Sequence, residues 1–176
     1  MKKMIIGIDP GKNGGIAVAY NGKIHTATKM PRTPNDLLEF FIHLGFPGVL
    51  ARCQVSVYIE NVHAMPTDTP SRAFTFGQGL GQIEGILAAM GLYDAPDRYF
   101  KVAPQTWMKS LNMKKTEEEK DNKELWKRRL KALATDLHPH LNPTLSTADA
   151  ILITAYGVLN ESCKMHEANG GGETKN

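Results

Sequence analysis

The amino-terminal segment constrains the fold of this chain more than any other stretch of its sequence. An apolar run at residues 3–8 ends in Asp9 and a glycine-rich turn, and a second apolar run follows at 14–20. Asn21-Gly22 then leads into a third strand-like run at 23–29, and this dipeptide is the strongest short signal for a β-hairpin. The segment therefore predicts a meander of three strands, and a carboxylate stands where the first strand ends in a turn.

The rest of the chain alternates between helical and strand-like patterns. Buried strands are predicted at 55–60 and 99–103 from their β-branched and aromatic content. Apolar residues at helical spacing, bounded by capping and breaking residues, predict helices at 33–44, 70–91, 104–111, 120–137 and 147–160. This order of elements predicts a mixed α/β domain whose meander feeds a central sheet.

A single globular domain is expected from the length and composition. The chain has 176 residues, of which 41% are hydrophobic and 22% are charged, and this is enough to bury a core. We place the domain at residues 1–160 and predict that the polar, glycine-rich segment 161–176 is a disordered tail. The two cysteines lack the spacing of a disulfide framework or a zinc ribbon. The first apolar stretch is too short for a signal peptide or a membrane span, so we expect a cytoplasmic protein with no membrane partner.

The helix predicted at 70–91 is unusual because it contains four glycines, at positions 77, 79, 81 and 85. Each glycine costs a helix interior roughly 1 kcal/mol relative to alanine. We therefore expect close backbone packing, against another helix or a phosphate, to offset this cost.

Basic residues are concentrated in one part of the chain, although the formal net charge is only +3. Between Arg98 and Lys131 there are eleven Lys or Arg against five Asp or Glu, so this segment carries +6 and the rest carries −3. Such asymmetry is typical of a face that binds a polyanion, and a solvated basic helix would give the same pattern. Charge alone does not separate these two interpretations.

Three carboxylates lie where elements of the predicted sheet meet. Asp9 and Glu60 each end a core strand, and Asp149 lies in the first turn of the last helix. Each has an ordinary explanation when taken alone: a turn residue, the surface end of a strand, and a capping box with Ser146. Together they would repel each other at one rim of the sheet, and a hard divalent cation such as Mg²⁺ or Mn²⁺ usually offsets such repulsion. The sequence thus indicates a metal site that could activate water and clamp a phosphate.

Motifs for other chemistries are weak. The turn "GKNGG" lacks the spacing of a phosphate-binding loop, and "GLGQIEG" lacks the strand that precedes a dinucleotide fingerprint. Ser146 does not lie in a G-x-S-x-G elbow, so a serine hydrolase has no support. We therefore expect no nucleotide cofactor.

Four motifs, in order along the chain, resemble those of a known family. They are "IGIDPG" at the first strand, "YIENV" at the fourth, "GQGLGQIEGILAAMG" after it and "STADAILITAYG" at the last helix. Over residues 4–157 the chain resembles RuvC-type Holliday-junction resolvases of the RNase H-like superfamily, and looks most like the small versions carried by bacteriophages. The resemblance implies an RNase H-like mixed five-stranded sheet, with a β-meander of three strands and then two more, flanked by helices.

The resemblance also implies an activity and its partners. It implies a divalent-metal endonuclease, using Mg²⁺ or Mn²⁺, that acts as a homodimer on four-way DNA junctions and nicks two strands of like polarity. The expected ends are a 5′-phosphate and a 3′-hydroxyl. Branched DNA and a second copy of the chain are the expected partners, and the cytoplasm of a host cell is the expected location if the protein is phage-encoded.

Functional residues carry over by position. Asp9, Glu60 and Asp149 correspond to metal ligands of the family, and Ser146 replaces the fourth ligand, so it is a candidate ligand only through its hydroxyl. His63 stands where some members carry an aromatic residue that wedges into the junction. The cations expected to orient the scissile phosphate or to hold a duplex arm are Lys114, Lys115, Lys120, Lys127, Arg128 and Arg129.

Three other interpretations stay open. A relaxed nuclease that cuts replication forks and flaps would share every residue named above. A junction-binding protein without catalysis is compatible with the serine at position 146. An actin-like ATPase or a sugar kinase begins with a similar strand and turn, but such chains normally have two domains and are much longer.

Overall fold

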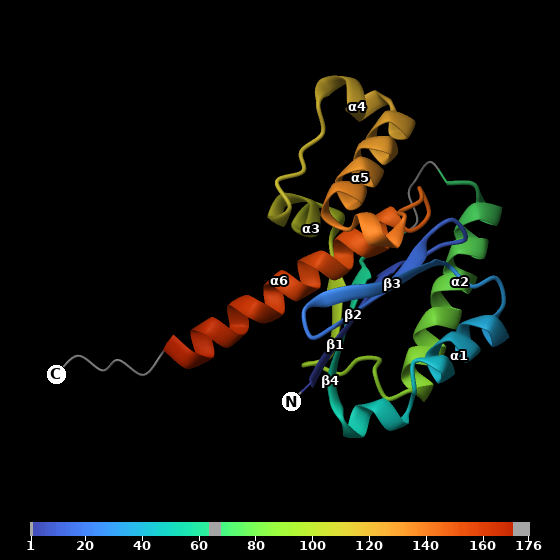
Figure 1. Ribbon diagram of the computed structural model, residues 1–176. Coiled ribbons are helices and arrows are strands. Elements are labelled where there is room, and N and C mark those ends of the chain that lie inside the picture. Colours follow the sequence, from blue (N-terminus) through green and yellow to red (C-terminus); the bar gives the residue numbers. More distant parts are fainter. Residues whose placement is uncertain (1, 64–67, 171–176) are drawn as a thin grey trace.

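The computed structural model describes residues 2–63 and 68–170. It contains a five-stranded mixed sheet with helices on both faces (Figure 1). A meander of three strands followed by two more strands is the predicted architecture, and the structure confirms it. Among the described helices, none is both long enough and apolar enough to cross a membrane.

The strands of the sheet follow the order β3-β2-β1-β4-β5. The central strand β1 (Lys2–Asp9) pairs antiparallel with β2 (Gly15–Tyr20) and parallel with β4 (Cys53–Glu60). β3 (Lys23–Lys29) extends the meander beyond β2, and β5 (Tyr99–Val102) pairs parallel with β4. Because β1, β4 and β5 run in the same direction, their carboxyl ends lie at the same edge of the sheet.

The helices form two layers, one on each face of the sheet. In Figure 1, α1 and α2 cover one face, whereas α6 crosses the other face, where α3 and α5 also lie. A short helix, α4, precedes α5, and two short 3₁₀ turns, η1 and η2, lie in connections. The bounds are α1 (Pro34–His43), η1 (Gly48–Ala51), α2 (Pro70–Ala89), α3 (Pro104–Ser110), α4 (Glu117–Asp121), α5 (Lys123–Leu137), η2 (Pro139–Leu141) and α6 (Ala148–Gly170).

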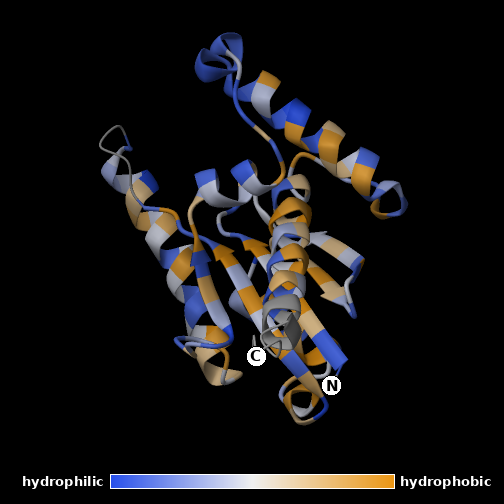
Figure 2. Ribbon diagram, turned by 90° about the vertical axis from the view of Figure 1, so that its left-hand side faces the viewer, coloured by the Kyte–Doolittle hydropathy of each residue, from blue (hydrophilic) through white to orange (hydrophobic). Residues whose placement is uncertain are grey.

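The alternation of side chains along β1 divides the interior into two apolar cores. Ile6 and Ile8 belong to the core that the sheet forms with α1 and α2, together with Leu87. Ile5 points to the opposite face and belongs to the core with α3, α5 and α6, which includes Trp107. Figure 2 shows apolar residues along the strands and on the part of α6 that crosses them, and a hydrophilic end at α4. Both faces of β1 are therefore buried, which fixes the strand at the centre of the molecule.

Helix α6 lies directly on β1 because two positions at their contact are glycines. A Cβ atom on Gly7 would stand 2.8 Å from the carbonyl oxygen of Ala150. In the same way, a Cβ atom on Gly157 would stand 2.8 Å from Cγ2 of Ile5. These close approaches hold the first turn of α6, which carries Asp149, against the carboxyl-terminal half of β1.

Replacing Gly7 with alanine should therefore destabilise the fold and displace α6. We expect the free energy of unfolding to fall by about 1–3 kcal/mol, the usual cost of overpacking a rigid core. Urea unfolding followed by circular dichroism measures this change. Gly48→Ala is the matched control, since no atom of the described residues lies within 4 Å of its added Cβ, and it should change stability by less than about 0.5 kcal/mol. Equal effects of the two substitutions would contradict this account of the helix–strand contact.

Two helix boundaries differ from the sequence prediction. The helix expected at 120–137 is interrupted at Asn122, whose Oδ1 accepts a hydrogen bond of 3.0 Å from the backbone N–H of Leu125 and so begins α5. The last helix, expected to end at Asn160, continues to Gly170, so residues 161–170 of the predicted tail extend α6. Residues 171–176 of that tail lie outside the described residues.

The expected close packing of the α2 glycines is not found within one chain. At Gly77, Gly79, Gly81 and Gly85, no atom of the described structure lies within 4 Å of the position that a Cβ would take. The backbone of α2 is thus open along the side that these residues occupy, so its packing against another helix, such as one of a second copy, or against a phosphate stays a prediction.

Candidate active site

The three predicted acids come together at the carboxyl edge of the sheet. Ile8 of β1 pairs with Ile59 of the parallel strand β4. The last residues of these two strands, Asp9 and Glu60, therefore lie side by side at the edge of the sheet. The contact of α6 with β1 places Asp149 beside them. Each of the other two acids contributes electrostatically to the pKa of Asp9. The sequence therefore identified an actual cluster of carboxylates.

The cluster is buried, and burial acts strongly on its acids. Only 9% of Asp9 is exposed, and this burial, assisted by the negative charges of Asp149 and Glu60, raises the pKa of Asp9 to about 8. Burial also raises the pKa of Glu60, although the indole N–H of Trp107 donates a hydrogen bond of 3.0 Å to its Oε1 and opposes this shift. Buried carboxylates that disfavour each other's charge form an environment that a cation would stabilise.

Asp149 does not have the capping role that its sequence context allowed. The reciprocal hydrogen bonds at this helix start join Thr144 and Thr147. The backbone N–H of Thr144 donates to the hydroxyl of Thr147 at 2.9 Å, and the backbone N–H of Thr147 donates to the hydroxyl of Thr144 at 3.3 Å. Asp149 instead accepts a hydrogen bond from the ammonium of Lys127 through Oδ2. Its Oδ1 is buried and has no hydrogen-bond partner among the described residues. The carboxylate of Asp149 therefore belongs to the acid cluster, and one of its oxygens has no hydrogen-bond partner among the described residues.

Lys127 is the cluster residue whose position the sequence did not reveal. It was predicted to contact DNA, but its ammonium forms an ion pair with Asp149. Burial alone would lower the pKa of Lys127, but the charges of Asp149, Asp9 and Glu60 outweigh this effect and raise it. A signal was present in the helical periodicity, because Lys127 precedes the buried residues Leu130 and Ala134 by three and seven positions.

Trp107 is a second residue that sequence reasoning missed. It is fully buried in α3 and holds the Glu60 carboxylate through its indole N–H. A buried tryptophan needs a partner for this group, so the tryptophan in the short helix after the fifth strand could have been matched to one of the acids.

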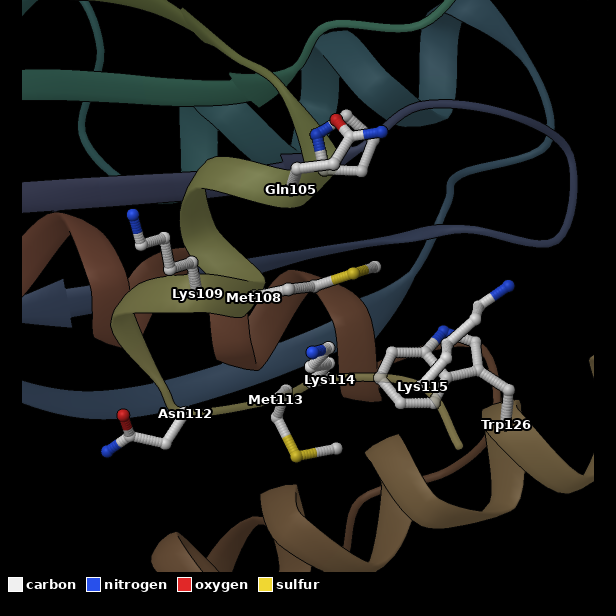
Figure 3. A pocket seen from close by; sticks show the side chains of 9 residues that line it. Gln105, Met108, Lys109, Asn112, Met113, Lys114, Lys115 and Trp126 are labelled. Atoms are coloured by element: carbon white, nitrogen blue, oxygen red, sulfur yellow. The ribbon is translucent and has the colours of Figure 1, made fainter. Parts of the chain in front are cut away.

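The other predicted DNA-binding cations are largely paired inside the α4–α5 region. Lys120 pairs with Glu117 at 2.6 Å, Arg128 with Glu124 at 2.6 Å and Arg129 with Glu119 at 2.7 Å. Lys114 and Lys115 instead line a cavity of about 780 Å³ between α3 and α5, where Lys115 lies over the ring of Trp126 (Figure 3). Three of the basic residues in this segment are therefore paired with acids of the same segment, which keeps its net charge of +6.

A groove beside the acid cluster is lined by a different set of basic residues. It lies between α2 and the turns that follow β1 and β3, and both Ser146 and His63 line it. Its described lining includes one acid, Asp68, and the basic residues Lys12, Lys29, Arg32, Arg72 and Lys123. These residues come from segments far apart in the sequence, which is why the charge pattern alone did not group them.

The donor chemistry of the cluster suits a hard divalent cation. Carboxylate oxygens are the ligands that Mg²⁺ and Mn²⁺ prefer, and Oδ1 of Asp149 is buried without a hydrogen-bond partner in the described part of the chain. Within the described residues, however, no three His, Cys, Asp or Glu side chains are arranged as a ready-made metal cage. The ammonium of Lys127, bound to the other oxygen of Asp149, already supplies positive charge there.

Comparison with known proteins identifies similar solved structures. No protein-family model and no curated protein matches the sequence. Thermus thermophilus RuvC in complex with a Holliday junction substrate is 16% identical, with a TM-score of 0.53 over 90% of this chain and 96% of that chain. A second T. thermophilus RuvC structure is 18% identical, with a TM-score of 0.52 over 91% and 96%. The yeast mitochondrial Holliday junction resolvase Ydc2 is 13% identical, with a TM-score of 0.41 over 94% and 83%.

These comparisons concern the fold. The chain has the fold of RuvC across nearly its whole length, and the mixed sheet in the order β3-β2-β1-β4-β5 is the RNase H-like arrangement. The resemblance to RuvC-type resolvases that the four sequence motifs indicated is thereby confirmed at the level of the fold. The yeast structure, with its lower TM-score, adds nothing to this conclusion.

Proposed function

We propose that the protein is a divalent-metal-dependent endonuclease that resolves four-way DNA junctions by paired nicks. The observation that carries the proposal is the convergence of Asp9, Glu60 and Asp149 in a buried cluster, in which Oδ1 of Asp149 has no hydrogen-bond partner from residues 2–63 and 68–170. The RuvC fold supports it, since one of the similar structures is a RuvC bound to a Holliday junction substrate. The expected products carry 5′-phosphate and 3′-hydroxyl ends.

The three carboxylates would hold the ion, and the surrounding residues position them. A bound Mg²⁺ or Mn²⁺ would activate water and neutralise charge that develops on the scissile phosphate. Trp107 fixes the orientation of Glu60 through its hydrogen bond. The contact of α6 with Gly7 fixes the position of Asp149 relative to Asp9. The low exposure of Asp9 keeps bulk water from screening the charges of the site.

The groove lined by Lys12, Lys29, Arg32, Arg72 and Lys123 is the proposed path of the DNA backbone to the acids. Clustered cations in a groove attract phosphates without regard to base sequence. In this proposal most of the affinity comes from the shape and charge of the branched DNA, and the paired cations of α4 and α5 contribute less.

Neutralising two groove cations should weaken junction binding and reduce its salt dependence. For the double variant Lys29→Met and Arg32→Met, we expect the slope of log Kd against log salt to fall by roughly one unit for each lost phosphate contact. Fluorescence anisotropy with a labelled junction at several salt concentrations measures this slope. Lys23→Met is the control, since this exposed lysine at the start of β3 does not line the groove. A slope that the double variant leaves unchanged would remove the groove from the proposed DNA path.

A homodimer is part of the proposal, because paired nicks need two active sites in one complex. Phe74, Gly77, Gly81 and Gly85 follow each other at intervals of three and four residues and so share one side of α2. Phe74 is 74% exposed, and no described atom lies within 4 Å of a Cβ at the three glycines. Small residues in a row allow two helices to approach closely, so this side of α2 suits a second copy of the same helix.

A charged side chain on this side of α2 should separate the two protomers. We expect Gly81→Glu to sediment as a monomer at concentrations at which the parent protein is a dimer, and to lose the coupling between the two nicks. Gly48→Glu, at another glycine with open space around it, should remain dimeric. A parent protein that sediments as a monomer and still makes paired nicks would refute the symmetric arrangement.

The proposed function is tested by comparing branched substrates. The parent protein is incubated in Mg²⁺ with a synthetic four-way junction, a replication fork, a flap and a linear duplex, each end-labelled. Symmetric nicks in the junction alone, with ends that DNA ligase can seal, support the proposal. Equal cutting of forks and flaps would indicate a relaxed branched-DNA nuclease, and tight junction binding without any cutting would indicate a non-catalytic binding protein.

A further inference from the structure

We propose that the cavity between α3 and α5 is a docking site for an acidic peptide segment of another protein, which inserts a large apolar side chain into it. The cavity has a volume of about 780 Å³, and ligand sites in proteins typically measure about 300–1,000 Å³. This site goes beyond the proposed function, because its lining includes none of the three acids and none of the residues that line the groove.

The floor of the cavity is apolar and adaptable. Met108 of α3 and Met113, which follows α3, project into the space between the two helices, near Trp126 of α5 (Figure 3). Both methionines are half-buried and pack against the apolar core on this face of the sheet. Because a thioether side chain is flexible and polarizable, methionines adapt to apolar partners of different shape. The floor therefore suits a leucine, isoleucine or phenylalanine side chain.

Three lysines give the same cavity a strong positive charge. Lys109, Lys114 and Lys115 line it, and all three are exposed. None of them forms an ion pair with an acid among residues 2–63 and 68–170. In Figure 3, Lys109 and Lys115 lie on opposite sides of the two methionines. An apolar side chain in the floor would thus be flanked by cations, so acidic residues before and after it in a peptide complement the site.

The lining favours a peptide over nucleic acid. Single-stranded nucleic acids bind proteins by stacking bases on open aromatic rings, and Trp126 is the aromatic residue of the described lining. Only 4% of Trp126 is exposed, and the cationic groups of Lys115 and Arg129 lie 5.6 Å and 5.8 Å from its ring centroid. A duplex backbone, in turn, has no apolar group that would fill the methionine floor. Carboxylates on a chain with an apolar anchor match both features of the cavity.

The position of the cavity allows a peptide and DNA to bind at the same time. The cavity and the groove share no lining residue. Helix α3 contributes Met108 to the cavity and, one residue earlier, Trp107 to the acid cluster through its hydrogen bond to Glu60. A partner docked here would therefore be held beside the candidate active site without covering the groove.

A short synthetic peptide tests the proposed chemistry of recognition. The probe carries a fluorescein label and a Leu-Phe pair with two aspartates on each side, and its anisotropy is measured with the full chain in EDTA. One control peptide has Ser-Ser in place of Leu-Phe, and the other has asparagine in place of each aspartate. We expect the probe to bind at least about tenfold more tightly than either control, because the site uses both an apolar anchor and charge.

Variants of the chain locate the binding. The double variant Lys114→Glu and Lys115→Glu should weaken probe binding by at least about tenfold, since like charges then face each other. The double variant Lys23→Glu and Lys131→Glu makes the same change of charge at two exposed lysines outside the cavity, and it should bind the probe like the parent. Met113→Ser removes apolar contact without changing charge, and it should weaken the probe but not the Ser-Ser control peptide. Thermal melting establishes that each variant folds.

Three outcomes would overturn the proposal. They are equal affinity for the three peptides, probe binding that the Lys114 and Lys115 substitutions leave unchanged, and binding of a labelled oligothymidine that these substitutions weaken as much as they weaken the probe. The last outcome would assign the cavity to nucleic acid. Because the peptide titrations contain neither metal nor DNA, their result does not depend on whether the protein cuts junctions.

Discussion

Asp9→Asn should abolish Mg²⁺-dependent cleavage of a four-way junction while leaving the fold and the binding of the junction nearly intact. Asparagine keeps the size and the turn-forming capacity of aspartate, but it lacks the charge that a hard cation requires. We expect the cleavage rate to fall by at least about a hundredfold, the scale on which loss of one electrostatic contact to the transition state acts. Single-turnover cleavage with the enzyme in excess over a labelled junction measures the effect.

Asp97→Asn provides the matched control for this substitution. Asp97 is an exposed acid before β5, so its neutralisation should leave the cleavage rate within a factor of about two of the parent rate. Junction affinity of Asp9→Asn, measured in Ca²⁺ or EDTA, should equal or exceed that of the parent, because one source of repulsion with phosphate is removed. Loss of both binding and folding in Asp9→Asn would instead assign Asp9 a structural role.

The second large effect is a fall in the stability of the metal-free chain as the pH rises. Burial, with the charge of Asp149, raises the pKa of Asp9 to about 8, so the native chain keeps a proton that an unfolded aspartate releases near pH 4. The native state binds more protons than the unfolded state between these two values, and the free energy of unfolding therefore falls with rising pH in this window. The contribution of Asp9 is full below about pH 4 and is lost by about pH 8.

Urea unfolding in EDTA between pH 5 and 9 tests whether the free energy of unfolding falls as the pH rises. The difference in stability between Asp9→Asn and the parent should grow in favour of the variant as the pH rises towards about 8. The comparison removes the proton of Asp9 together with its electrostatic effect on Asp149 and Glu60, and all other titrating groups are common to both chains. Parallel pH profiles for the two proteins would show that Asp9 does not hold a proton in the folded state.

Local patterns made most of the fold predictable from the sequence. The meander follows from the alternation around Asn21-Gly22, and the sheet has the predicted strands within one or two residues of their expected ends. The acids were identified because each lies at the end of a predicted element, a position that sequence defines well. Residues Asp9 and Glu60 then meet because β1 and β4 are parallel neighbours, a consequence of the topology.

Features that depend on packing between helices could not be predicted in the same way. Lys127 was grouped with Arg128 and Arg129 as one basic surface, but α5 packs on α6 so that only Lys127 reaches Asp149. The partner of the open side of α2 could not be identified either, because a glycine pattern does not say whether the partner is a helix of the same chain, a helix of a second copy or a phosphate. The start of α4, three residues before the predicted helix start, carried a readable signal, since Thr116 and Glu119 form the capping box that begins it.

One cleavage assay decides whether a metal-binding cluster of three acids cuts DNA junctions. The parent, Asp9→Asn and Asp149→Asn are each incubated with a synthetic four-way junction in Mg²⁺ and in EDTA, and both strands are mapped. We expect paired symmetric nicks by the parent in Mg²⁺ only, and cleavage by either variant that is slower by at least about a hundredfold. Cleavage by both variants at the parent rate would contradict this expectation and leave Asp9 as a turn residue.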